Sequence, residues 1–326
     1  MRRPWFTALL ILPWLACSLS ASALEPEVQA AKDEGMRLWG QHEWIKMQPY
    51  LEQAAEAGDV EAMYYLGEAT RLLGRGLTEE VMGWYLKAAE QGDPYAMLRL
   101  FQGGACIAGD ECPEDAEGWR EKALAETLPR AEAGDTDAML ALYHVYRLMD
   151  DRGEGVDWLE KSAEQGNSEA QTRLGKSILD GQGWYFLKSR RLEAAEGWLR
   201  KAAEQGYVPG MIALTSVLDD LDKNKELWEW ILEASKRGSR IARVVYGECL
   251  VNPEREAYCQ AKKDVVRGWA ILQAVVEEVD DRTARYIMES NRDRLTPGQL
   301  SQAEAMVDEW LNRQPPLSNF PPRFGF

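Results

Sequence analysis

Histidine, cysteine and paired carboxylates are the side chains from which this sequence could build a reactive site. Its 326 residues include two histidines, His42 and His144, too few for a multi-histidine metal site or for His-based catalysis. Carboxylates are abundant, with 54 Asp and Glu, so no pair is distinguished as a general acid and base. Neither a Gly-rich phosphate loop nor a G-x-S-x-G elbow is present. We therefore predict no catalytic residue, no metal and no cofactor, and a protein that is not an enzyme.

One segment imitates a calcium-binding loop. Asp220-Leu221-Asp222-Lys223-Asn224 has the opening pattern of such a loop, but Lys225 stands where Gly is required and Ile231 where Glu is required. We interpret it as a polar turn. His42 is expected to be exposed in the first interhelical corner.

The five cysteines depend for their chemistry on the compartment, and the N-terminus predicts export. Met1-Arg2-Arg3 is positive, Trp5 to Ala16 is apolar, and Ala21-Ser22-Ala23 is a small-residue cleavage site, so residues 1–23 form a signal peptide and the mature chain is periplasmic. The alternative is a lipoprotein anchored through Cys17, since Leu15-Ala16-Cys17 resembles part of a lipobox. Cleavage after Ala23 would change the formal net charge from −16 to −18.

Four cysteines remain in the mature chain, as two local pairs. In an oxidising compartment we predict the disulfides Cys106–Cys112 and Cys249–Cys259, because local pairing closes the smallest loops among the three connectivities. The alternative, a metal site, requires C-x2-C type spacing, which neither pair has.

An internal repeat organises the rest of the chain. Ala88-Ala89-Glu90-Gln91-Gly92 recurs as Ala202 to Gly206 and, with one change, as Ser162 to Gly166. Looser copies end at Gly58, Gly134, Gly238 and Asp280. A small residue follows each anchor by four positions, and a large apolar residue follows that by four more. The small residues are Ala62, Ala96, Ala138, Ala170, Gly210, Ala242 and Ala284.

This spacing predicts helix pairs. Apolar residues four apart share a helical face, and Gly past the last turn ends a helix in a left-handed cap. One pair cannot bury its own apolar face, so the pairs must stack into an all-α solenoid. Most of the thirteen Trp, among them Trp84, Trp158 and Trp198, are then expected to pack between repeats.

The predicted organisation has no boundary between conventional domains. Residues 24–57 form an N-terminal capping pair, 58–295 the solenoid, and 296–312 a C-terminal capping helix with Thr296 as N-cap and Pro297 at its first position. Residues 313–326 form a Pro- and Phe-rich extended tail, which could fold back on the last helix, dock a partner or be disordered.

These motifs resemble the Sel-one-like repeat (SLR) family, relatives of tetratricopeptide repeats. Asp59 to Gly67 together with Trp84 to Gly92 is close to a full consensus unit, and the pattern covers residues 26–312 with degenerate copies at Val208-Pro209-Gly210 and after Ser239. The resemblance implies a right-handed superhelix of about eight stacked antiparallel pairs that binds another protein.

The resemblance also implies a role. Exported, acidic proteins of this repeat type look like periplasmic immunity proteins that sterically block a type VI secretion effector of the phospholipase type. The alternative is a periplasmic or lipid-anchored adaptor for polysaccharide export or cell-wall machinery.

Three insertions alternate with short units along the predicted solenoid. The anchor spacings of 34, 42, 32, 40, 32 and 42 place the extra residues between the two helices of every second pair, at 103–113, 181–190 and 251–263. Such loops line one edge of a solenoid, so they either bind a partner or are tolerated insertions. Trp184, Tyr185 and Phe186 are the candidate contacts in the second loop.

A row along the first helices is the candidate inner groove. Side chains three and six positions after each small residue share a face, with a basic centre at Arg99, Arg173 and Lys176. The alternative is a solvated face. The candidate groove residues are Tyr65, Glu68, Arg99, Gln102, His144, Arg173, Lys176, Ser216 and Glu248.

Charge favours one class of partner. The net charge excludes nucleic acid and an anionic membrane surface as the main partner, because both require a positive footprint. Acidic clusters at the corners, such as Asp150-Asp151 and Asp219-Asp220, predict a protein partner with a basic patch.

Overall fold

The computed structural model describes residues 24–74, 76, 78–102 and 116–324, and within these ranges it contains helices and no strand. The predicted signal peptide, Cys17, the Cys106–Cys112 pair and the whole first insertion lie outside the described residues. The helices are α1 Pro26–Gly40, α2 Trp44–Glu56, α3 Val60–Gly74, α4 Glu79–Glu90, α5 Pro94–Gln102, α6 Ala116–Glu132, α7 Thr136–Leu148, α8 Arg152–Glu164 and α9 Ser168–Leu179. They continue as α10 Lys188–Glu204, α11 Val208–Asp220, α12 Asn224–Lys236, α13 Arg240–Val251, α14 Val265–Val279, α15 Arg282–Ser290, α16 Pro297–Glu304 and α17 Val307–Leu311.

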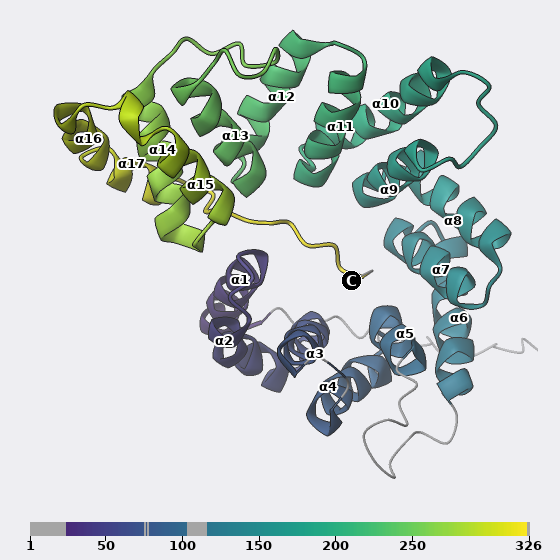
Figure 1. Ribbon diagram of the computed structural model, residues 1–326. Coiled ribbons are helices and arrows are strands. Elements are labelled where there is room, and N and C mark those ends of the chain that lie inside the picture. The colour runs from purple at the N-terminus through teal and green to yellow at the C-terminus, as the bar shows by residue number, and fades with distance from the viewer. Residues whose placement is uncertain (1–23, 75, 77, 103–115, 325–326) are drawn as a thin grey trace, which may run out of the picture.

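The helices pack in chain order, and the prediction of an all-α solenoid is confirmed. Each helix contacts its neighbours in the sequence, from α1 with α2 through α13 with α14. Figure 1 shows the odd-numbered helices from α1 to α13 toward the inside of a curved arc and their even-numbered partners outside. Buried apolar side chains form successive clusters along this arc, as expected where each pair buries the face of the next.

The anchors end helices as predicted. Gly58, Gly92, Gly134, Gly166, Gly206 and Gly238 all have φ between 81° and 99°, the left-handed region that glycine enters without a steric penalty. Asp280 takes this conformation in the seventh copy. The residue after the anchor then begins the next helix, because its side chain accepts a backbone N–H bond at six corners. These N-caps are Asp59, Asp93, Asp135, Asn167, Ser239 and Asp281.

Close approach within a pair depends on small residues. A Cβ atom on Gly67 would lie 2.5 Å from the Tyr85 ring, and one on Gly175 would lie 2.7 Å from Leu199. Each glycine therefore admits a large side chain of the second helix, which explains the L-G motif of the repeat. The predicted packing role of Trp158 is also met, since it is buried, while Trp84 and Trp198 are half-buried.

The short corners between the two helices of a pair share one backbone feature. The short corners place a single non-glycine residue at positive φ, as His42, Asp150 and Asp222 do. Asp222 lies between the end of α11 and the start of α12, so the calcium-like segment is the polar turn that we predicted. His42 is exposed, also as predicted.

The C-terminal end of the solenoid differs in one detail from the expectation. Thr296 and Gln299 form a capping box and Pro297 is the first helical residue, as predicted. The expected single helix over 296–312 is instead two short helices, α16 and α17, because the chain turns at residues 305–306. Both pack on α14, and the break lets their apolar faces meet that helix separately.

Candidate functional site

The C-terminal tail crosses the inside of the arc. After α17 it runs from the α14 and α15 end toward α5 and α7 (Figure 1). The backbone N–H of Leu317 donates to Glu278 at 2.7 Å, and that of Asn319 donates to the Gly40 carbonyl at 2.7 Å. The Gln41 side chain also donates to Glu278, so the first and last parts of the solenoid are tied together. The tail therefore folds back, and it docks on the whole inner face instead of the last helix alone.

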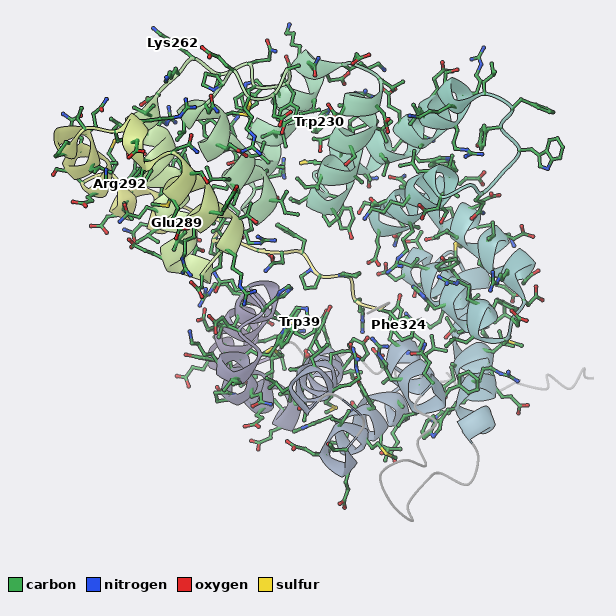
Figure 2. All side chains as sticks on the ribbon, viewed as in Figure 1. Trp39, Trp230, Lys262, Glu289, Arg292 and Phe324 are labelled. Atoms are coloured by element: carbon green, nitrogen blue, oxygen red, sulfur yellow. A yellow bond between two sulfur atoms is a disulfide. The ribbon has the colours of Figure 1, made fainter. Side chains whose placement is uncertain are left out.

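The tail ends in two anchored side chains. Arg323 forms an ion pair with the buried Asp93 and lies 4.9 Å from the ring centre of Tyr95, and its carbonyl accepts a 2.6 Å bond from the Tyr64 hydroxyl. Phe324 is buried inside the arc (Figure 2), and Arg173 donates to its carbonyl at 2.7 Å. The inner face thus holds an extended Arg-Phe segment through both side chains and both carbonyls.

A buried ion pair supports the Phe324 ring. Arg99 donates two bonds of 2.6 and 2.9 Å to the carboxylate of Glu68, which also accepts from Tyr85 and Arg71. Burial opposes the ionisation of Glu68, but these hydrogen bonds and the Arg99 charge hold its pKa below the usual value. The Arg99 guanidinium lies 4.5 Å from the centre of the Phe324 ring.

Asp93 has a second task besides capping α5. Its Oδ1 accepts the Ala96 N–H at 2.8 Å, while its Oδ2 pairs with Arg323. Burial raises the pKa of Asp93, and the Arg323 charge and backbone N–H groups offset part of that effect. The ionised carboxylate consequently depends on the tail.

His144 faces the tail as an uncharged side chain. Its ring centre lies 4.8 Å from that of Phe324, and its Nε2 is buried without a hydrogen-bond partner among the described residues. Burial lowers the pKa of His144 well below 6.5, and the charges of Arg173, Arg147 and Arg99 lower it further. The histidine therefore stays neutral at pH values where an unfolded histidine is protonated.

The difference between the folded and unfolded pKa of His144 predicts that the protein loses stability in mild acid, at pH values above those at which carboxylates titrate. Because the folded pKa of His144 is depressed, its contribution to stability is present above pH 6.5 and is lost as the pH falls, by up to about 1.4 kcal/mol per pH unit. Urea unfolding at pH 7 and pH 5 should show this loss, and His144→Phe should remove most of it. His42→Gln is the control and should remove a smaller part of the loss, because burial and the Arg240 charge lower the pKa of His42 less than that of His144. An unchanged pH slope in His144→Phe would contradict the assignment.

The predicted groove residues fall into three environments. Arg99, His144 and Arg173 are brought together around Phe324, and Glu68 supports them from the core. Tyr65 is buried against Trp39, with ring centres 5.0 Å apart, and Gln102 is exposed but accepts from Arg99. The remaining three lie further along the row. Lys176 and Ser216 line a cavity of about 300 Å³ beside Phe320, and Glu248 pairs with Arg255 of the third insertion.

The predicted groove is therefore not an open surface. The tail covers Arg99 and His144, which the sequence places on the groove face but which are buried in the structure. Sequence reasoning missed Asp93, Tyr64 and Tyr95, the residues that receive Arg323. The repeat offered no signal for them, since their positions serve capping and packing in the other copies.

The second insertion carries the most exposed large apolar side chains of the described residues. Trp184 is 87% exposed and Phe186 88% exposed, and their rings meet edge to face at 5.2 Å. Tyr185 instead packs against the cluster around Leu174 and Ile178. Two of the three predicted contacts therefore point into solvent, while the third fixes the loop to α9.

The third insertion carries the predicted Cys249–Cys259 disulfide, which is confirmed. Cys249 lies on α13, and Cys259 lies in the loop that returns to α14. The disulfide tethers this loop to the solenoid at its midpoint.

Two further chemistries were searched for within the described part of the chain. No group of three or more His, Cys, Asp and Glu side chains there is arranged to hold a metal ion. None of the helices described combines the length and the apolar character that a bilayer crossing demands.

Comparison with known proteins identifies the fold. No protein-family model matches the chain. Over 168 residues, 52% of its length, it is 30% identical to the uncharacterized protein NMB1327 of Neisseria meningitidis serogroup B, and this match covers only 33% of that relative. The chain also superposes on the crystal structure of c5321, a protective antigen of uropathogenic Escherichia coli strains with an SLR fold. The TM-score is 0.50 at 22% identity, covering 88% of this chain and 62% of that one. The chain thus has the SLR fold expected from its repeats.

Weaker likenesses extend to two other solved structures. The first is a Sel1 repeat protein from Oxalobacter formigenes, with a TM-score of 0.38 at 18% identity, covering 81% of this chain and 99% of that one. The second is the immunity protein PA5088 of Pseudomonas aeruginosa, with a TM-score of 0.44 at 17% identity, covering 82% of this chain and 88% of that one. Scores of this size carry no inference about function.

Proposed function

We propose that this SLR solenoid is a binding protein and not an enzyme. It would be exported by residues 1–23 and act in the periplasm as an immunity protein. In this role it covers the active-site mouth of a secreted phospholipase-type toxin. The proposal rests on the sequence resemblance described above and on one structural observation, the exposed aromatic loop at the edge of the arc.

The aromatic loop has the chemistry of an interface hot spot. Trp184, Phe186 and Leu187 are exposed next to one another, whereas the other large apolar side chains of the helix pairs are mostly buried. Burying an exposed Trp or Phe against a partner contributes a large share of the binding free energy, and such residues dominate many interfaces. Because Tyr185 and the turn at Gly183 anchor the loop, little conformational freedom would be lost on binding.

The edge that carries this loop also carries acidic corners. Asp150, Asp219 and Asp220 are exposed there; Asp220 pairs with Lys188 at 2.9 Å, and Asp150 lies 3.8 Å from Arg152. Carboxylates around an aromatic centre favour a partner with a basic rim, such as the mouth of a phosphate-handling active site. The tail blocks the inner groove, so we place the main contact on this edge.

The loop makes the proposal testable by affinity. Replacing both Trp184 and Phe186 by Ala should weaken partner binding at least tenfold, because truncating an aromatic hot spot costs about 2 kcal/mol or more. The mature chain would be used to capture its partner from envelope extract, and the affinity of each variant measured by calorimetry. Tyr286→Ala is the matched control, since Tyr286 is 65% exposed on α15.

The identity of the captured protein decides between the candidate functions. The proposal requires that it has phospholipase activity and that the wild-type chain inhibits this activity at equimolar ratio. Recovery of a polysaccharide-export or cell-wall complex would favour the adaptor role instead, in which a lipidated Cys17 would anchor the solenoid. Unchanged binding in the Trp184 and Phe186 double variant would show that the partner does not contact this loop.

A further inference from the structure

A cavity near the C-terminal end of the arc collects positive charge. It measures about 440 Å³ and lies between α12, α13, α14 and α17. Four basic side chains and no carboxylate occur among the described residues that line it, in a chain whose net charge is −16. The basic residues are Lys236, Arg243, Arg267 and Arg313.

Three of these guanidinium groups surround one indole ring. Relative to the ring centre of Trp310, Arg313 lies at 3.4 Å, Arg267 at 5.7 Å and Arg243 at 5.9 Å. Cation–π attraction holds each of them near the ring, but an indole has no net charge with which to neutralise three cations. Arg313 pairs with Glu309, whereas among the described residues no carboxylate forms an ion pair with Arg243 or Arg267.

Arg243 is the unusual member, because the repeat expects an apolar residue there. It follows the small residue Ala242, and the equivalent positions hold the buried methionines Met63, Met97, Met139 and Met211. Arg243 is buried to the same degree, with 2% of its surface exposed. Burial lowers its pKa, the Arg313 charge adds to this effect, and Glu278 opposes it. A charged group therefore replaces a core methionine at a cost to the fold.

The backbone contact of Arg243 does not explain that cost. Its Nη2 donates to the Ser235 carbonyl at 3.1 Å, eight residues earlier in the chain. In an equivalent repeat the neutral Gln171 donates at 3.0 Å to Ala163, also eight residues earlier. An amide thus suffices for this bond, and the charge of Arg243 is left without a structural use.

The cavity also holds hydrogen-bond donors that lack acceptors. The Nε of Arg243 and the Nε1 of Trp310 are buried and have no partner among the described residues. Other buried donors of the chain, such as those of Trp39 and Trp158, also lack a partner, so it is the uncompensated charge of Arg243 and Arg267 that points to a missing anion. Guanidinium groups pair best with carboxylate and phosphate oxygens, because their planar N–H groups match these oxyanions.

We infer that this cavity, defined by Arg243, Arg267, Arg313 and Trp310, binds a small oxyanion ligand that carries a phosphate or a carboxylate. Arg243 and Arg267 neutralise the oxyanion, because Lys236 and Arg313 already pair with Glu233 and Glu309. The volume is within the range of about 300–1,000 Å³ typical of small-molecule sites. This site is separate from the aromatic loop and does not depend on the proposed immunity function.

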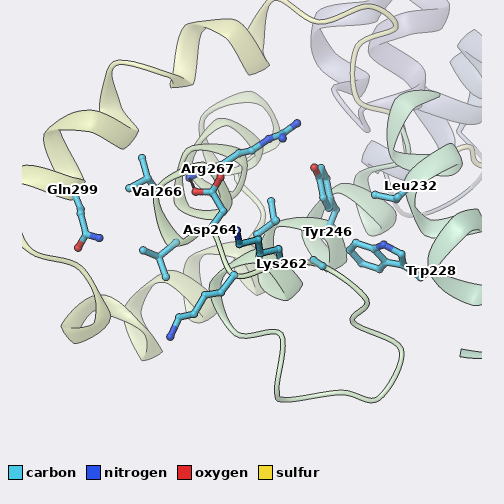
Figure 3. A pocket seen from close by; sticks show the side chains of 12 residues that line it. Trp228, Leu232, Tyr246, Lys262, Asp264, Val266, Arg267 and Gln299 are labelled. Atoms are coloured by element: carbon cyan, nitrogen blue, oxygen red, sulfur yellow. Dashed lines mark hydrogen bonds between the residues drawn. The ribbon is translucent and has the colours of Figure 1, made fainter. Parts of the chain in front are cut away.

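A second cavity adjoins the site and leaves room for the body of a ligand. It measures about 700 Å³ and shares Leu232, Tyr246 and Arg267 with the basic cavity. Figure 3 shows Trp228 and Tyr246 on its wall together with Arg267 and Lys262. Its one acidic side chain, Asp264, caps α14 by accepting the Arg267 N–H at 3.0 Å. An aromatic wall beside cations suits an organic anion with an apolar or planar part.

Calorimetry on the mature chain tests the inference, with inorganic phosphate and citrate as probes at constant ionic strength. We expect at least one of the two to bind with a dissociation constant of about 1 mM or below. Arg243→Gln should weaken this binding at least tenfold, because it keeps the bond to Ser235 and removes the charge. Trp310→Phe should weaken it as well. Phosphate alone would assign a phosphate ligand, and citrate alone a carboxylate ligand.

Two controls separate binding from folding. Arg285→Gln changes the equivalent position of the next repeat, where the side chain is exposed, and should bind like the wild type. Arg243→Met restores the repeat residue and should raise the unfolding temperature without ligand while abolishing the response to it. The inference fails if neither probe binds, if Arg243→Gln binds as tightly as the wild type, or if Arg243→Met destabilises the fold.

Discussion

Replacing Arg99 by Met lowers the free energy of unfolding by about 3–5 kcal/mol, the usual cost of breaking a buried ion pair from one side. The substitution removes the two bonds that Arg99 donates to Glu68 and leaves a carboxylate that is wholly buried. Arg71 and the Tyr85 hydroxyl still donate to Glu68, but Arg71 is partly exposed and reaches one oxygen only. The Phe324 ring also loses the cation against which it packs.

Urea unfolding followed by circular dichroism measures this loss, and a double variant gives its cause. Glu68→Leu combined with Arg99→Met removes both charges, so it should lose clearly less stability than Arg99→Met alone. Arg71→Met is the matched control on the same carboxylate and should cost about 1 kcal/mol or less, since Arg71 is partly exposed. A loss below about 1 kcal/mol in Arg99→Met would show that the pair is not the support of the groove.

The repeat made most of the fold predictable. Gly92 and Gly206 mark helix ends because a left-handed cap requires glycine, and the spacing of Ala62 and Leu66 fixes the buried face of α3. The Cys249–Cys259 disulfide followed from loop length. All of these are local relations, repeated along the chain, and the sequence therefore carries several copies of each signal.

The path of the tail could not be predicted in this way. Arg323 meets Asp93 across 230 residues and Tyr64 across 259, and neither contact recurs in another repeat. Asp93 has the same sequence context as the other helix N-caps, and the second oxygens of Asp59 and Asp281 also pair with a cation, so only the tail origin of its partner distinguishes Asp93. Prolines limit the tail to an extended path but do not say which surface it follows.

The aromatic loop and Arg243 illustrate the opposite case. Trp184 and Phe186 depart from the repeat by insertion, and Arg243 departs from it by substitution at a methionine position. Both departures were visible in the sequence, but their meaning depended on burial. The loop residues are exposed where an apolar residue is unfavourable, and Arg243 is buried where a charge is unfavourable.

Removing the tail, residues 315–326, should be the most disruptive change outside the helices. The loss of buried Phe324 alone costs about 3–5 kcal/mol, as for other Phe deletions from a core, and Asp93 then loses its cation. The tail also joins α1 to α14 through Gly40 and Glu278, and its removal leaves the Gln41 bond to Glu278 between these ends, so the two ends of the arc should separate more readily. Because stacked repeats unfold in part, hydrogen exchange of each helix is the appropriate measurement.

The pattern of exchange distinguishes a strap from a general loss of stability. Exchange should accelerate most in α1, α5, α7 and α14, which the tail contacts, and least in α10, with which residues 315–324 form no hydrogen bond, ion pair or ring contact. Phe324→Ala should reproduce the effect at α5 and α7 only, with Phe320→Ala as the half-buried control in the same tail. Equal exchange in the truncated and intact chains would contradict a docked tail.

Truncation should leave the affinity for the partner that Trp184 and Phe186 bind unchanged, since these side chains lie on the outer loop. A large gain in affinity would instead mean that the partner uses the inner groove.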